Sequence, residues 1–247
     1  LELSGRDDVA LVLRGGSSDE LSSGLGRDQV SLIEAAPGIA RDARGAIASP
    51  EFYTIVDLPM RSTGTSANVP FRGVTARAPE VREGFRIVAG RMFEPGKDEV
   101  IVGRGAFAQF GNVDLGRVVT WGSHQWRVVG VFEAGGSVSE SEVWTDLTVL
   151  QGVYRRGNSV QVVRVQLTSP AAIDEVQRWL DADPRIDPSV RSEREFYADQ
   201  SRILVTMIRY VGTTIAVLMG IGAVFAALNT MYSAVSSRTR EIATLRA

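Results

Sequence analysis

The stretch from Tyr210 to Ser237 contains no charged residue and no proline. About 20 apolar residues are enough to cross the hydrocarbon core of a bilayer, which is roughly 30 Å thick. A helix that is apolar all round either lies in the core of a large protein or spans a membrane. A buried core helix is therefore the alternative, but the uncharged length favours a transmembrane helix, which we predict at residues 210–233.

The residues just before this stretch form a second helical pattern. Apolar side chains recur at helical spacing through residues 192–209, including Phe196, Ile203 and Met207, and no proline interrupts them. The pattern predicts a stalk helix continuous with the membrane helix. Its apolar stripe needs a partner, and a second membrane helix entering before Leu1 would supply one.

Small residues recur along one face of the predicted membrane helix, and a single strongly polar residue lies near its end. These residues are Gly212, Ala216, Gly220, Ala223, Ala227 and Asn229. Such a face lets two helices approach closely in lipid, so we expect it to pack against another helix. The alternative is that glycine and alanine are simply common in membrane helices.

The last segment, residues 234–247, is short and basic. It holds Arg238, Arg240 and Arg246, with Glu241 as the opposing charge. Positive residues collect on the cytoplasmic side of a membrane helix. We therefore expect the C-terminus in the cytoplasm and the large N-terminal domain on the outer side of the membrane.

Residues 1–191 are typical of a water-soluble α+β domain. Two β-α-β-like units, at 9–48 and 160–191, share the pattern Ala-x-Pro-x-Ile after the helix, although so short a pattern can also recur by chance. Most of the region between them, residues 49–145, shows strand and turn patterns. We interpret it as a β-rich insertion into an α+β layer.

The composition excludes several kinds of chemistry. The chain has no cysteine and a single histidine, which excludes disulfides and thiolate or histidine-rich metal sites. A net charge of −2 gives no basic excess for binding nucleic acid. No phosphate-binding motif follows the glycines at 103–105, and the acidic pairs Asp98-Glu99 and Glu140/Glu142 are interpreted as solvated surface groups. We expect no enzyme activity and no bound cofactor on this chain.

Specific segments resemble the MacB-like and FtsX-like ABC transporter permeases. The C-terminal SSRTREIATLRA, with MGIGAVFAALNTMYSAV before it, carries the most specific match. GRMFEPGKDEVIVGRGAFAQFG and VDLGRVVTWGSHQWRVVGVFEAGGS are similar to the family's extracytoplasmic core domain. The matching C-terminal residues are Asn229, Met231, Arg238, Arg240, Glu241, Ile242, Leu245, Arg246 and Ala247.

The resemblance implies a permease with four membrane helices and a large domain between the first two. This chain would then hold the periplasmic core domain, the second helix in the inner (cytoplasmic) membrane, and the start of the cytoplasmic coupling loop. A beginning at Leu1 fits such a piece of a longer protein, or an export signal that lies upstream. The family works as a dimer of permeases with two cytoplasmic ATPase subunits, so ATP and Mg²⁺ are expected on the partner ATPase.

The resemblance also assigns roles to the tail and to further partners. Contact with the ATPase would fall on Arg238, Arg240, Glu241, Leu245 and Arg246. The alternative is that these arginines anchor the helix at anionic lipid headgroups. Expected partners are the ATPase subunit, a second permease copy or homologue, membrane lipid, and a periplasmic adaptor or carrier.

Two functions from different classes follow. The first is a permease subunit that couples ATP hydrolysis to movement of a periplasmic domain, for export or for lipoprotein release. The alternative is a membrane-anchored extracytoplasmic binding or sensor module without transport activity. An anchored hydrolase is a third class, and no constellation of catalytic residues supports it.

Overall fold

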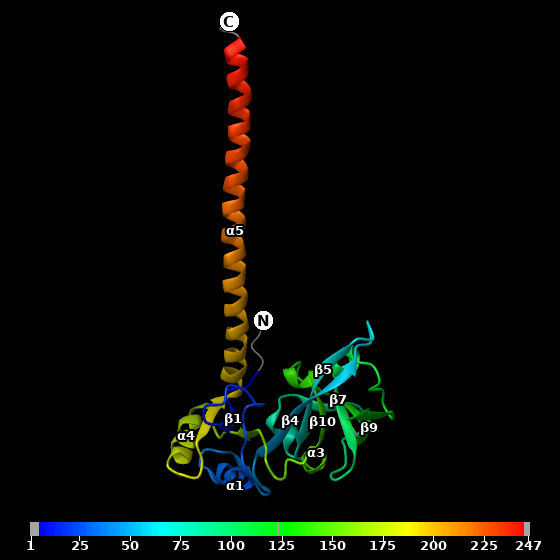
Figure 1. The fold of residues 1–247 in the computed structure, drawn as a ribbon. Helices are drawn as coiled ribbons and strands as arrows, with labels where there is room; N and C mark the ends of the chain where they lie inside the picture. The colour runs from blue at the N-terminus through cyan, green and yellow to red at the C-terminus, as the bar shows by residue number, and fades with distance from the viewer. Residues whose placement is uncertain (1–4, 123, 245–247) are drawn as a thin grey trace. The chain divides into compact units, whose positions relative to one another are not determined.

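The computed structural model describes residues 5–122 and 124–244, and the chain divides into two compact units, Leu1–Tyr197 and Ala198–Ala247 (Figure 1). The strands are β1 (Val9–Arg14), β2 (Arg41–Asp42), β3 (Gly45–Ala46), β4 (Ala48–Pro59), β5 (Ser66–Val74), β6 (Phe85–Gly90), β7 (Glu99–Gly103), β8 (Val118–Trp121), β9 (His124–Ala134), β10 (Val143–Asp146), β11 (Val162–Gln166) and β12 (Pro188–Ser192). The helices are α1 (Arg27–Ala35), α2 (Arg104–Gln109), α3 (Leu147–Val153), α4 (Ile173–Asp181) and α5 (Glu193–Thr244). Short 3₁₀ turns lie at Ala78–Val81 (η1), Val138–Ser141 (η2) and Pro170–Ala172 (η3).

Four strands and two helices form the layer from which α5 starts. The strands lie in the order β12-β1-β11-β4, and each neighbouring pair is antiparallel. The units β1-α1-β4 and β11-α4-β12 therefore interleave, which is the split β-α-β arrangement of ferredoxin-like folds. This confirms the two predicted β-α-β-like units. We call these elements, with the first turn of α5, the helix-bearing layer.

The core of this layer explains the repeated sequence pattern. Ile33 of α1 and Val176 of α4 are fully buried in the same apolar cluster, so both helices cover one face of the sheet (Figure 1). Ile39 and Ile186, the isoleucines of the repeated Ala-x-Pro-x-Ile pattern, are buried in that cluster too. The pattern thus marks equivalent positions after two equivalent helices.

The second half of β4 continues the sheet into a β-rich part. Residues Ala48–Glu51 of β4 pair with β11, and the residues from Phe52 to Pro59 pair with β5. The sheet then runs β4-β5-β10-β7-β9-β6, with β8 added beside β9. We call the second half of β4, strands β5 to β10, and helices α2 and α3 the β-rich part.

Aromatic side chains fill the core of the β-rich part. The ring of Phe71 meets Trp121 at 4.8 Å and Trp126 at 5.1 Å between ring centroids, both edge to face. Edge-to-face pairs of this kind add to the stability gained from burial. Ala106 of α2 and Leu150 of α3 are buried in the same cluster. The tryptophans at 121 and 126 therefore have a packing role.

Gly103 lets the η2 turn lie directly over the end of β7. A Cβ atom built on Gly103 would lie 2.2 Å from the carbonyl oxygen of Glu140. The Gly103 amide donates to the carbonyl of Glu142 at 2.9 Å. The missing side chain therefore sets the position of Glu142, which enters the buried ion network described below.

Replacing Gly103 with alanine is expected to lower the free energy of unfolding by about 1–3 kcal/mol, because backbone has to move to admit the Cβ atom. The four tryptophans lie between residues 121 and 179. Urea denaturation of the full chain in mild detergent, followed by tryptophan fluorescence, therefore reports on the first unit. Gly152→Ala is the matched control, since its Cβ would meet nothing within 4 Å in α3. We expect it to be neutral or stabilising by up to about 1 kcal/mol. Equal effects of the two substitutions would contradict the close approach.

Helix α5 is continuous over 52 residues, which is about 78 Å at 1.5 Å per residue. Its segment Thr206–Ser236 contains an 18-residue stretch with a mean hydropathy of 2.1, and that stretch is not buried within the chain. In the described part of the chain, it is the one helix long and apolar enough to span a membrane. The apolar side chains are exposed, so the alternative of a buried core helix does not describe this structure.

Candidate functional site

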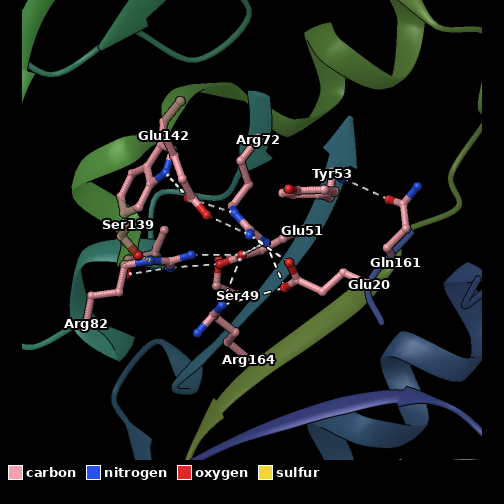
Figure 2. A network of polar contacts seen from close by, with 12 residues as sticks. Glu20, Ser49, Glu51, Tyr53, Arg72, Arg82, Ser139, Glu142, Gln161 and Arg164 are labelled. Atoms are coloured by element: carbon pink, nitrogen blue, oxygen red, sulfur yellow. Dashed lines mark hydrogen bonds and ion pairs between the residues drawn. The ribbon is translucent and has the colours of Figure 1, made fainter. Parts of the chain in front are cut away.

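A network of buried charges lies where the β-rich part, the helix-bearing layer and the start of α5 meet (Figure 2). Its anions and cations come from segments far apart in the chain. The carboxylates are Glu20, Glu51, Glu142 and Glu193, and the guanidinium groups are Arg72, Arg82 and Arg164. A buried charge without a partner is costly, so the network constrains how these segments lie.

Glu51 is the residue shared by all three arginines. It is fully buried on β4, where the pairing of that strand changes from β11 to β5. Its Oε1 lies 2.7 Å from Nη1 of Arg82, and its Oε2 lies 3.0 Å from Nη1 of Arg72. The same Oε2 lies 3.4 Å from Nε of Arg164. Figure 2 shows the three guanidinium groups converging on this carboxylate.

Within the network, Arg72 of β5 forms the most hydrogen bonds to carboxylates. Its guanidinium forms two hydrogen bonds to Glu20, at 3.0 and 2.8 Å, and two to Glu142, at 2.9 and 2.8 Å. A further bond of 3.0 Å reaches Glu51. The ring of Tyr53 lies 4.8 Å from the guanidinium carbon, in a cation–π arrangement. Two-pronged arginine–carboxylate pairs are among the strongest and most directional polar contacts in proteins.

Arg82 extends the network toward the core of the β-rich part. Its Nη2 donates to Glu51 at 2.8 Å, and its Nη1 donates to the carbonyl of Ala78 at 3.2 Å. The guanidinium carbon lies 4.3 Å from the ring of Trp144. The indole Nε1 of Trp144 in turn donates to Glu142 at 2.7 Å. Trp144 therefore connects Arg82 to Glu142, which binds Arg72, and it also fills part of the core.

Arg164 of β11 connects the network to the first turn of α5. Its side chain is fully buried and forms an ion pair with Glu193. Its Nη2 donates to the hydroxyl of Tyr197 at 2.9 Å. The other oxygen of Glu193 accepts the backbone amide of Arg6 at 3.1 Å. Two residues of α5, one turn apart, are thus held by one buried arginine of the sheet.

The ionisation of the network follows from its geometry. Burial by itself raises the pKa of Glu51, but the charges of Arg82, Arg72 and Arg164 outweigh it and bring this pKa to about 2. The pKa of Glu20 is lowered in the same way, because Arg72 overcomes the effect of burial. Both carboxylates are therefore ionised at neutral pH. Glu51 and Glu20 are thus fixed negative charges within the network.

A polar cavity of about 600 Å³ borders the network. Arg6, Glu193 and Arg194 line it from the helix-bearing layer. Arg82 and the loop residues 134–137 line it from the β-rich part. The two parts are therefore not packed against each other at this place.

The stalk and membrane residues singled out in the sequence all fall on α5. Phe196 is buried against Leu11 and Leu13 of β1, whereas Met207 is 62% exposed. The side chain of Ile203 is outside the described residues. The members of the small-residue face are exposed on the apolar span: Gly212, Ala216, Gly220, Ala223, Ala227 and Asn229. Their packing against another helix stays a prediction.

The residues assigned to ATPase contact lie at the C-terminal end. The backbone of Arg238, Arg240 and Glu241 is helical, in the last turns of α5, and the side chains of these residues are outside the described part. Leu245 and Arg246 lie beyond the described residues altogether. Their proposed contact stays a prediction.

Two acidic residues interpreted as solvated are in fact buried. Glu142 is 3% exposed and pairs with Arg72, and Glu99 is 7% exposed and pairs with Arg91 at 2.5 Å. Their position next to turns suggested exposure, but an arginine on a neighbouring segment compensates each charge. Asp98 does lie at the surface, where it contacts Nε2 of His124 at 2.8 Å.

The network itself was not identified from the sequence, although a signal for it exists. Glu51 precedes Phe52 in a buried strand, and Arg72 follows Phe71 in another. Arg164 lies between two valines of β11. A charged residue inside an apolar strand needs a buried partner. The pattern could have marked these positions, but not which charges pair.

Comparison with known proteins places this geometry in context. The family model of the MacB-like periplasmic core domain matches residues 2–183. The chain is similar to the extracellular domain of the noncanonic ABC-type transporter YknZ from Gram-positive bacteria, with a TM-score of 0.52, 17% identity, and coverage of 74% of this chain and 98% of that one. It is also similar to the periplasmic region of MacB from Actinobacillus actinomycetemcomitans, with a TM-score of 0.55, 14% identity, and coverage of 79% and 92%. At these identities the likeness shows the fold. A search of curated proteins gave no match.

Proposed function

Because the chain belongs to the MacB-like periplasmic core domain family, we propose that its domain is moved by a cytoplasmic ATPase through α5. The chain is a permease domain of an ABC transporter, on the periplasmic or extracellular side of a membrane and anchored by a membrane helix. Mechanical coupling to ATP hydrolysis, for export or for lipoprotein release, is the specific role that we propose.

The continuity of α5 carries this proposal. Its first turn is held in the buried network by Glu193 and Tyr197, and the same helix continues through the apolar span to the basic residues near 240. Proline would break the i to i−4 hydrogen bonds, and none occurs in the helix. A continuous helix passes a displacement at one end to the other, which is what transmission across a membrane needs.

The orientation and the partners complete the proposal. Helix α5 crosses the inner membrane of the cell, and residues 234–247 lie in the cytoplasm. There they contact the ATPase through Arg238, Arg240, Glu241, Leu245 and Arg246. ATP and Mg²⁺ bind to that ATPase subunit and not to this chain. A second permease copy or homologue packs beside α5, and a periplasmic adaptor or carrier meets the outer domain.

Reversing the charges of the tail tests ATPase contact. In the assembled transporter, the double substitution Arg240→Glu/Glu241→Arg is expected to lower transport per ATP hydrolysed by about tenfold or more, because like charges then face each other across the contact. ATPase activity and transport are measured together in proteoliposomes, with membrane insertion checked separately. Arg178→Glu/Glu175→Arg, at exposed positions of α4, is the matched control and should leave coupling unchanged.

Normal coupling in the tail variant would contradict ATPase contact and favour an anchoring role for the arginines. A wild-type chain that neither recruits an ATPase nor transports would favour the alternative, a membrane-anchored binding or sensor module.

A further inference from the structure

We propose that Glu51 is a buried latch that holds the helix-bearing layer and the β-rich part together, so that a displacement of α5 moves both. This inference rests on the proposed function, in which α5 is the moving element. The latch consists of the Glu51 carboxylate and the three arginines that share it.

The position of Glu51 in the sheet is the first argument. Among the described residues, β4 is the one strand that pairs with both β11 and β5. Glu51 faces Val162 of β11 and is the last residue of β4 paired on that side, while Phe52 already faces Gly73 of β5. A rotation of the β-rich part against the layer would act on β4 between residues 51 and 52. Glu51 is thus at the hinge point of the backbone.

The origin of its partners is the second argument. Arg72 and Arg82 reach Glu51 from the β-rich part, and Arg164 reaches it from the layer. Arg164 also holds Glu193 and Tyr197 of α5. An unbroken series of polar contacts therefore runs from the first turn of α5 to both sides of the hinge point.

The physical character of these contacts makes the connection stiff. Apolar contacts are non-directional, so two apolar surfaces slide without losing much burial. Buried ion pairs depend on distance and angle, and a shift of a few ångströms leaves a buried charge without its partner. The best-attested role of buried charged groups is to fix one relative arrangement of the segments that carry them.

The cavity beside the network is the third argument. It separates the loop at 134–137 and Arg82 from Arg6, Glu193 and Arg194. Side-chain packing therefore does not block a relative rotation at the cavity itself. Leu147 packs against the cores of both parts, so an apolar contact remains when the latch is removed.

Distance measurement on the full chain tests the latch. The chain has no cysteine, so Ser31→Cys on α1 and Thr120→Cys on β8, both exposed, give a clean pair of spin-label sites. In detergent or nanodiscs, double electron–electron resonance should give one narrow distance distribution for the wild-type background. Glu51→Gln is expected to widen the distribution by about twofold, because Arg72, Arg82 and Arg164 lose their shared anion. Asp57→Asn, the same acid-to-amide change at an exposed position of β4, should leave it unchanged.

If Glu51→Gln does not fold, a milder variant takes its place in the test. Arg82→Gln leaves Glu51 with Arg72 and Arg164, and tryptophan fluorescence checks its fold. It should widen the distribution by a smaller factor. A distribution as narrow as the wild type in every folded latch variant would overturn the proposal.

Transport separates the latch from the proposed function. In the assembled transporter, the folded latch variants should keep their ATPase activity and transport several-fold less per ATP. A widened distribution with normal coupling would overturn the latch as a transmission element and leave the proposed function intact. A wild-type assembly without ATP-dependent transport would overturn the proposed function itself, whereas the distance measurement would still decide whether Glu51 holds the two parts.

Discussion

Replacing Arg72 with methionine is expected to lower the free energy of unfolding of the first unit by about 3–5 kcal/mol. Methionine keeps much of the side-chain volume but leaves Glu20, Glu51 and Glu142 without their common cation. The loss comes from uncompensated buried charge and not from the net attraction of the pairs, because a buried ion pair contributes little beyond its own desolvation cost.

The control for this prediction is an arginine with similar partners at the surface. Arg44 pairs with Asp42 and Glu80, but its side chain is 65% exposed. Arg44→Met should therefore change the free energy of unfolding by about 1 kcal/mol or less. Urea denaturation followed by tryptophan fluorescence measures both variants. Equal changes in the free energy of unfolding for Arg72→Met and Arg44→Met would show that burial is not the cause of the destabilisation.

The stability of the domain is expected to fall steeply in acid because of Glu51. The pKa of this carboxyl is about 2 in the folded protein, below the ordinary value of 4.5. A lowered folded-state pKa gives stability that is fully present above about pH 4.5 and is lost as the pH falls toward 2. The difference corresponds to about 3 kcal/mol. Glu20, whose pKa is also lowered, acts in the same direction.

Comparison with Glu51→Gln isolates this contribution. The amide resembles the protonated acid, so the gap in unfolding free energy between wild type and variant should close as the pH falls from 4.5 to 2. Urea denaturation at several pH values measures the gap. Asp42 also has a pKa of about 2, but it is exposed to solvent and is present in both proteins, so its contribution cancels. A gap that stays constant over this range would show that folding does not lower the pKa of Glu51.

The sequence predicted those features that depend on local patterns. The uncharged stretch beginning at Tyr210 predicted a transmembrane helix at residues 210–233, and α5 has an apolar, unburied span from Thr206 to Ser236 that is long enough to cross a membrane. The two Ala-x-Pro-x-Ile patterns predicted paired β-α-β units, and Ile39 and Ile186 do lie in one core. Apolar periodicity is read one segment at a time, so a single sequence is enough to recognise it.

The interpretation of the acidic residues failed because solvation is not a local property. Glu142 lies next to a turn, like many exposed glutamates, but the close approach at Gly103 brings its backbone over β7 and its side chain to Arg72. Nothing within a few residues of Glu142 indicates that arginine. The same holds for Arg164, whose partner Glu193 belongs to a different element of the fold.

The amino-acid sequence by itself determined the membrane-spanning length of α5, the alternation of strands and helices, and the kind of permease domain that the chain forms. The first two depend on the order of apolar and polar residues along the chain, and the third follows from the resemblance of specific segments to the MacB-like family. The tertiary structure alone decided that Glu51 is shared by three arginines and that one of them holds the first turn of α5. The physical reason is that the strength of a charge pair depends on distance and burial, and both are set by how the strands of the two parts meet at β4.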